Sequence, residues 1–140
     1  SLPVEKLHVL PQDNPQAETA LESDEVITHI ELPQPPAQLR SSYRKVRARA
    51  TWDFALAGLA LALELDDGRV KNCRVVLSGA APIPWRSHPV EKLLQGNQLT
   101  ETTIAEAARA IIKDAEPLAE NRYKLNIFQG IIEEELAALA

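Results

Sequence analysis

A run of basic side chains around one tyrosine is the part of the sequence with the clearest capacity for chemistry. It begins at Tyr43 and carries Arg44, Lys45, Arg47 and Arg49. Cationic side chains beside an aromatic ring can hold phosphate groups and stack on bases, so nucleic-acid binding is one function to consider. However, the formal net charge of the chain is −5, and no second basic run accompanies the first. We therefore expect no nucleic-acid partner.

Other residue types that form metal or catalytic sites are few and scattered. The three histidines, His8, His29 and His88, have no paired ligand spacing, so we expect no metal site. Cys73 is the only cysteine, which excludes an internal disulfide and indicates a reducing compartment. No nucleophile stands beside a recognisable base. The sequence predicts no catalytic residue in this chain.

The composition indicates one folded domain preceded by an arm. A chain of 140 residues, 45% of them hydrophobic, can bury its own core. No apolar stretch approaches the roughly 18 residues of a membrane-spanning helix, so we expect no membrane partner. The chain contains no methionine, which indicates a fragment or a processed chain. Residues 1–24 contain three prolines and few large apolar residues, so we predict an extended connector arm there and the domain over residues 25–140.

Strands are predicted in the first half of that domain. Residues 26–32 form a short apolar run that favours a strand, and residues 41–49 alternate as in a strand with one wet face. Residues 51–65 are compatible with helix or strand, because alanine and leucine favour helix while the leucines recur at every second position. The hairpin signal Asp66-Asp67-Gly68, followed by the β-branched run 70–77, favours an antiparallel pair that begins near Ala55. We predict that its first strand is central and buried on both faces.

Three helices are predicted in the second half. Ser87 can cap a short helix over residues 88–95, a periodic apolar pattern runs from Thr102 to Ala115 and stops at Pro117, and a third apolar stripe covers residues 125–139. Strands followed by helices indicate the α+β class. The expected fold is a small antiparallel sheet of three to four strands packed against three helices.

Short motifs follow one another in order along almost the whole chain. They are Glu25–Pro33, Tyr43–Arg49, Asp53–Ala55, Gly68–Val70, Ser78–Ala81, Pro84–Arg86 and Glu91–Gly96. In order and spacing they resemble the C-terminal domain of the FAD-binding (medium) subunit in the xanthine dehydrogenase, CO dehydrogenase and aldehyde oxidoreductase family of molybdenum hydroxylases. The arm at Leu10–Leu21 is similar to the connector before this domain in bacterial aldehyde oxidoreductase flavin subunits. The resemblance implies a part of an oxidoreductase that is not catalytic alone.

The same resemblance implies cofactors and partners. FAD would be bound mainly by an N-terminal domain with glycine-rich loops, and the five glycines of this chain show no such spacing. Partner subunits would carry the molybdenum cofactor and iron–sulfur clusters, which pass electrons from the substrate to FAD. A cytoplasmic location is expected, or a periplasmic one within such a complex.

Five site residues are implied by position in the family motifs. Lys45 falls where the family places a lysine beside the isoalloxazine ring, and Ile27 falls where an aliphatic side chain lies against the flavin. Arg49, Trp52 and Asp53 match a loop that approaches the flavin and gates access to it. The residues themselves leave other interpretations open: a solvated lysine, a core isoleucine, and a tryptophan that packs or anchors an interface.

Two functions from different classes follow. In the first, the domain covers one side of the FAD site and docks the flavin subunit within an electron-transferring complex. In the second, it is a non-enzymatic α+β interaction module that shares only the arrangement of sheet and helices.

Overall fold

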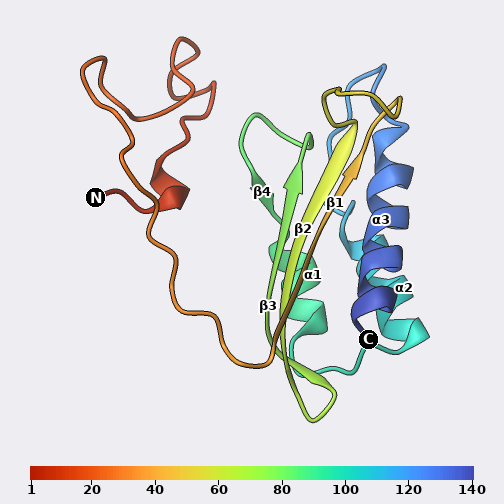
Figure 1. The fold of residues 1–140 in the computed structure, drawn as a ribbon. Coiled ribbons are helices and arrows are strands. Elements are labelled where there is room, and N and C mark those ends of the chain that lie inside the picture. Colours follow the sequence, from red (N-terminus) through yellow and green to blue (C-terminus); the bar gives the residue numbers. More distant parts are fainter.

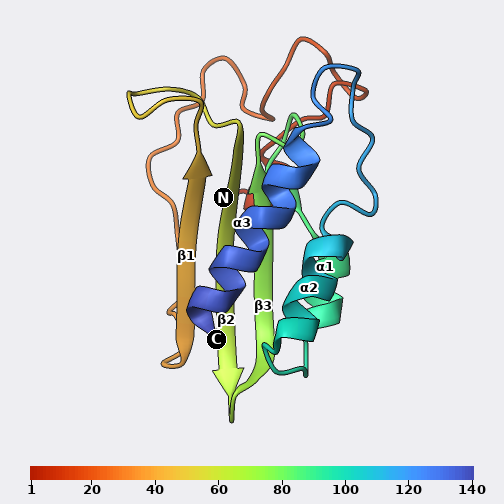
Figure 2. The ribbon, with the colours of Figure 1, turned by 90° about the vertical axis from the view of Figure 1, so that its right-hand side faces the viewer.

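A four-stranded antiparallel sheet with three helices on one face forms the body of the chain (Figures 1 and 2). The computed structural model describes residues 1–140 without a gap. Its elements are the 3-10 helix η1 (Val4–Lys6), the strands β1 (Leu39–Val46), β2 (Ala57–Asp66), β3 (Arg69–Ser78) and β4 (Trp85–Arg86), and the helices α1 (His88–Leu94), α2 (Glu101–Ala110) and α3 (Lys124–Leu139). The strands lie in the order β1-β2-β3-β4, so each pairs with its neighbour in sequence. The predicted α+β fold is confirmed.

The hairpin between β2 and β3 organises the sheet. Its turn consists of Asp67 and Gly68, whose φ angles of 47° and 73° both lie in the left-handed region. A two-residue turn of this kind matches the twist of the flanking strands, and glycine adopts it without steric cost. The turn places Leu61 opposite Val75. Pairing with β3 on one side and β1 on the other therefore settles residues 57–66 as strand rather than helix.

The two faces of this sheet differ. The side chains of Leu59, Leu61 and Leu63 on β2 are buried against the helices, whereas Ala60 between them is exposed. The prediction that β2 is buried on both faces is wrong, because all three helices lie on the same side of the sheet. We call the other side the open face. Its three central rows are Ser41, Ala62 and Arg74; Tyr43, Ala60 and Val76; and Lys45, Gly58 and Ser78.

The helices cover the opposite face in a row. In Figure 2, α3 crosses β1 and β2, α1 lies beside β3, and α2 packs between α1 and α3. Apolar side chains from all three helices, including Leu94, Ala107 and Ile132, complete the core. The helix predicted to reach Ala115 ends earlier, at Ala110, and the chain turns before α3 while Ile111 remains buried.

A partly buried ion pair closes the edge of β3 beyond β4. Because β4 contains only two residues, the N–H of Val75 has no strand partner there. The carboxylate of Glu91 on α1 accepts a hydrogen bond from Val75 N at 3.0 Å, and from Nε and Nη2 of Arg86 at 2.8 Å each. Burial alone would raise the pKa of Glu91, but these donors outweigh it and hold that pKa below its usual range. The motif residues Arg86 and Glu91 thus have a structural role.

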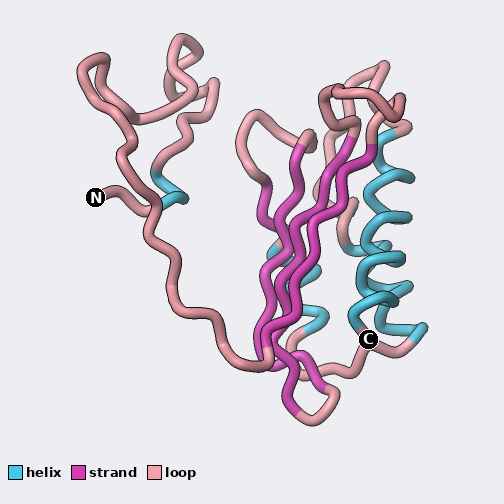
Figure 3. The backbone as a smooth tube through the Cα atoms, viewed as in Figure 1, coloured by secondary structure: helices cyan, strands magenta, loops and turns pink.

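The arm and the segment of residues 26–32 that follows it stand apart from the sheet (Figures 1 and 3). A strand predicted over residues 26–32 is wrong: the segment contains no secondary structure, and Val26 is 82% exposed. None of its backbone groups forms a backbone–backbone hydrogen bond. An extended segment becomes a strand only when another strand completes its ladder, and this chain offers none to it.

Candidate functional site

The side chains of Tyr43, Lys45 and Ser78 gather around Gly58 at one end of the open face, and we call these four residues the lysine cluster. Gly58 on β2 pairs with Lys45 on one neighbouring strand, β1, and with Ser78 on the other, β3. Gly58 is buried although it lies on the open face, since the hydroxyls of Tyr43 and Ser78 lie over it. A Cβ at position 58 would collide with Ser78 Oγ. The glycine therefore lets these hydroxyls approach the backbone of β2.

Two polar groups of this cluster have no partner within the chain. The Lys45 side chain is exposed, and its ammonium group forms no hydrogen bond or ion pair within the chain. Ser78 Oγ is buried and also has no hydrogen-bond partner. A buried hydroxyl without a partner costs free energy, which a ligand or a docked segment could recover. The cluster thus combines a free cation with an unpaired hydroxyl that is packed over a glycine.

The loop between β1 and β2 projects from the same end of the sheet. Arg49 Nε donates to Asp53 Oδ2 at 3.0 Å, and Asp53 Oδ1 accepts from the backbone N–H of Phe54 at 2.8 Å. These bonds hold the loop in shape while Trp52 is left 97% exposed and Phe54 93% exposed. Trp52 is therefore no packing residue within this chain. Phe54 was not predicted as a site residue, although a second large aromatic two positions after Trp52 is a signal in the sequence.

Ile27 does not join the other predicted site residues. It lies in the unpaired segment of residues 26–32 and is 51% exposed, so it is not a core isoleucine in this chain. Figure 1 shows the arm on the opposite side of the sheet from α3, connected to the sheet through the start of β1. The structure brings Lys45, Arg49, Trp52 and Asp53 to one end of the domain and leaves Ile27 apart from them.

The basic run does not form one surface. Tyr43 and Lys45 lie on the open face, whereas Arg44 points to the helix side and contacts Glu134 of α3 at 3.4 Å. Alternation along β1 divides the charges between two faces, and a phosphate-binding strip needs them on one. The absence of a nucleic-acid partner stays a prediction.

None of the helices has the length and apolar character needed to cross a membrane.

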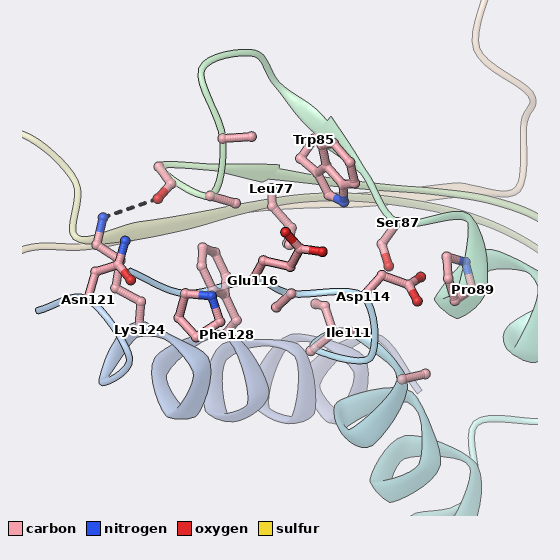
Figure 4. A pocket seen from close by; sticks show the side chains of 16 residues that line it. Leu77, Trp85, Ser87, Pro89, Ile111, Asp114, Glu116, Asn121, Lys124 and Phe128 are labelled. Atoms are coloured by element: carbon pink, nitrogen blue, oxygen red, sulfur yellow. Dashed lines mark hydrogen bonds between the residues drawn. The ribbon is translucent and has the colours of Figure 1, made fainter. Parts of the chain in front are cut away.

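A pocket at the loop end of the domain was not anticipated from the sequence (Figure 4). It lies between the β3–β4 loop, the start of α1, the α2–α3 connection and α3. Its lining residues are spread from Leu77 to Phe128, and no local motif joins them. Only the packing of the helices on the sheet places them together.

The fold defines an α+β domain built from an antiparallel sheet and three helices on one face. The family described as the CO dehydrogenase flavoprotein C-terminal domain matches residues 41–137, which is more than half of the chain. The chain belongs to this family, whose members form the C-terminal domain of FAD-binding subunits of molybdenum hydroxylases. The predicted resemblance is therefore confirmed.

Individual relatives agree with this assignment. The aldehyde oxidoreductase FAD-binding subunit of Escherichia coli strain K12 is 36% identical over 91% of this chain and 36% of its own length. The carbon monoxide dehydrogenase medium chain of Hydrogenophaga pseudoflava is 31% identical over 74% of this chain and 36% of its own length. A solved structure of carbon monoxide dehydrogenase from that organism superposes with a TM-score of 0.78 at 30% identity, covering 86% of this chain and 43% of the other. The chain spans less than half the length of these relatives.

Proposed function

We propose that this domain completes one wall of an FAD site whose main part lies in an N-terminal flavin-binding domain outside this chain. The observation that carries the proposal is the lysine cluster, in which Lys45 pairs with Gly58 in the register and its ammonium group has no partner within the chain. Ala60 next to the cluster is small and exposed on the open face, and Ser78 supplies an unpaired hydroxyl. FAD, when bound, accepts electrons and passes them on. The residues present therefore fit this cofactor.

In this proposal the chain's own residues tune and shield the flavin. The ammonium group of Lys45 favours negative charge on the reduced ring, because a nearby cation stabilises the anionic form. The loop held by Arg49 and Asp53 covers the ring edge with Trp52 and limits the access of water. Ile27 would reach the flavin only when the segment of residues 26–32 packs against the N-terminal domain. Lys45 and the loop residues Arg49, Trp52 and Asp53 already lie at one end of the sheet. The position of Ile27, in contrast, depends on docking.

We further propose that the domain docks the flavin subunit within a larger complex. Trp52 and Phe54 are exposed aromatic side chains, which are common anchors of protein interfaces. The partners would be the N-terminal FAD-binding domain and subunits that hold the molybdenum cofactor and iron–sulfur clusters. Substrate chemistry would occur in those subunits, so this chain alone would show no turnover. The division of the chain into residues 1–24 and 25–140 remains part of the proposal.

A titration with FAD tests the proposed wall. FAD is added to this chain alone, to the separately expressed N-terminal flavin-binding domain, and to their mixture, while flavin fluorescence quenching is recorded. We expect tight binding only in the mixture, and about tenfold weaker binding with Lys45→Ala. Lys92→Ala is the matched control, because Lys92 is an exposed lysine on α1 without an ion pair.

The same titration separates the two candidate functions. If the chain leaves FAD binding unchanged, with Lys45 or without it, the flavin wall is excluded. Binding of the two domains to each other, measured by calorimetry, then decides whether the open face and its aromatic loop act as a docking module alone. Loss of that binding in the double variant Trp52→Ala and Phe54→Ala would support docking through the loop.

A further inference from the structure

The pocket in Figure 4 is a second candidate site, separate from the lysine cluster. Its volume is about 390 Å³. Small-ligand sites commonly measure roughly 300–1,000 Å³, so the pocket is large enough for a small group or side chain. Leu77 and Phe128 place it on the helix-covered side of the sheet, and none of the predicted flavin-site residues lines it. Its chemistry can therefore be considered independently of the flavin proposal.

One wall carries a serine that is almost fully enclosed and forms no side-chain hydrogen bond. Ser87 occupies the position before α1 where a side-chain cap was predicted, but its hydroxyl forms no capping hydrogen bond. The residue is only 3% exposed. Figure 4 shows its oxygen directed into the pocket, near the side chain of Asp114. Because this hydroxyl has no partner within the chain and faces the pocket, it is free to form a hydrogen bond with a bound group there.

The charges of the pocket are unbalanced in the same region. The carboxylates of Asp114 and Glu116 line it and form no ion pair within the chain. Lys124 is the only basic residue of the lining, and its Nζ donates to the backbone oxygen of Gly79 at 3.2 Å. In Figure 4 it lies at the opposite end from Asp114. Two unpaired carboxylates at the Ser87 end favour a cation there.

An indole ring completes this end of the pocket. Figure 4 shows Trp85 on the side opposite α3, with Glu116 between the ring and the helices. The face of an indole attracts cations more strongly than other aromatic side chains do. Leu77 and Phe128 provide an apolar wall along which an aliphatic stem can lie. A guanidinium group is planar, carries only hydrogen-bond donors and stacks on aromatic rings, so it matches these surroundings.

We propose that this pocket binds a guanidinium group on an aliphatic stem, the chemistry of an arginine side chain. The group would stack on Trp85, contact the carboxylates of Asp114 and Glu116, and donate to the hydroxyl of Ser87. It can belong to a small free ligand or to an arginine of a partner polypeptide. The chemistry recognised is the same in both cases.

Fluorescence of Trp85 offers a direct test. The chain contains two tryptophans, and Trp52 is exposed outside the pocket, so Trp52→Phe leaves Trp85 as the only reporter. Agmatine represents a free ligand, and N-acetyl-L-arginine amide represents an arginine within a polypeptide. We expect a saturable change in emission with at least one of them. Equal affinities indicate recognition of the side chain alone, whereas tighter binding of the amide indicates a polypeptide.

Variants make the test specific. The double variant Asp114→Asn and Glu116→Gln should weaken binding about tenfold, because charge-assisted bonds to the guanidinium are lost. Glu120→Gln is the matched control, since Glu120 is an exposed glutamate of the same connection that does not line the pocket. Urea unfolding confirms that each variant is folded. The proposal is overturned if neither guanidinium probe saturates, if the neutral N-acetyl-norleucine amide binds equally well, or if the double variant binds like its parent.

Discussion

Leu61 and Ala60 are neighbours on β2, yet Leu61 is packed beneath the helices and Ala60 faces outward. The same contrast holds for the whole sheet. On β2 and β3 the covered face consists mainly of leucine and valine side chains, whereas the open face offers mostly small and polar residues: alanine, glycine, serine, tyrosine, lysine and arginine, with Val76. The covered face supplies the apolar burial that stabilises the domain. The open face contributes little to that burial, and its composition is therefore free to serve a ligand or a partner.

Substitution of one residue on each face tests this contrast most strongly. Leu61→Ala removes a fully buried side chain from the core and should lower the free energy of unfolding by about 3–4 kcal/mol. Ala60→Ser, one residue away on the open face, should change it by less than about 0.5 kcal/mol. Urea unfolding followed by circular dichroism measures both. Similar losses for the two variants would show that the open face is also part of the stabilising core.

Loss of the Glu91 carboxylate should have the next largest effect. Glu91→Ala leaves the buried N–H of Val75 without an acceptor and Arg86 without its bidentate partner, so we expect a loss of about 2–3 kcal/mol. Glu133→Ala, at an exposed position of α3, is the matched control. A loss no greater than that of the control would show that water replaces the carboxylate at the edge of β3.

Crowding of the lysine cluster should have a smaller effect. Gly58→Ala places a methyl group against Ser78 Oγ, and we expect a loss of about 1–2 kcal/mol. Ser78→Ala removes the obstructing oxygen, so the double variant should recover most of that loss. A double-mutant cycle from urea unfolding measures the coupling. Strictly additive effects would contradict the close contact between these two positions.

Acid should weaken the covered face through Glu91. Its pKa is lowered in the folded protein, so its contribution to stability is complete above the unfolded-state value of about 4.3 and is lost as the pH falls through the lower folded-state value. In Glu91→Gln there is no carboxylate at this position, so the stability of this variant does not change through this titration. The unfolding midpoints of the parent chain and of Glu91→Gln should therefore differ at pH 7 and become similar at pH 3. A constant difference between them would exclude Glu91 as the titrating group.

Several features of the fold could be predicted from local patterns. The turn at Asp67-Gly68 requires positive φ angles, and the leucines at every second position of β2 indicate one buried face. Helices α2 and α3 follow from apolar periodicity, and α1 was predicted from the cap position of Ser87. The same patterns could not show that Ala60 faces outward, because a strand of small and apolar residues looks alike whether one face or both are covered.

The sequence by itself determined the three long strands between residues 41 and 77, the helices and the family, since these depend on turn chemistry, periodicity and motif order. Only the tertiary structure decided that Lys45 lies across from Gly58, that Glu91 completes the edge of β3, and that Ser87 faces a pocket instead of capping α1. It also decided that residues 26–32 remain unpaired. The physical reason is that these features are contacts between segments distant in the chain, and a local pattern records a residue's own preference but not the partner that meets it.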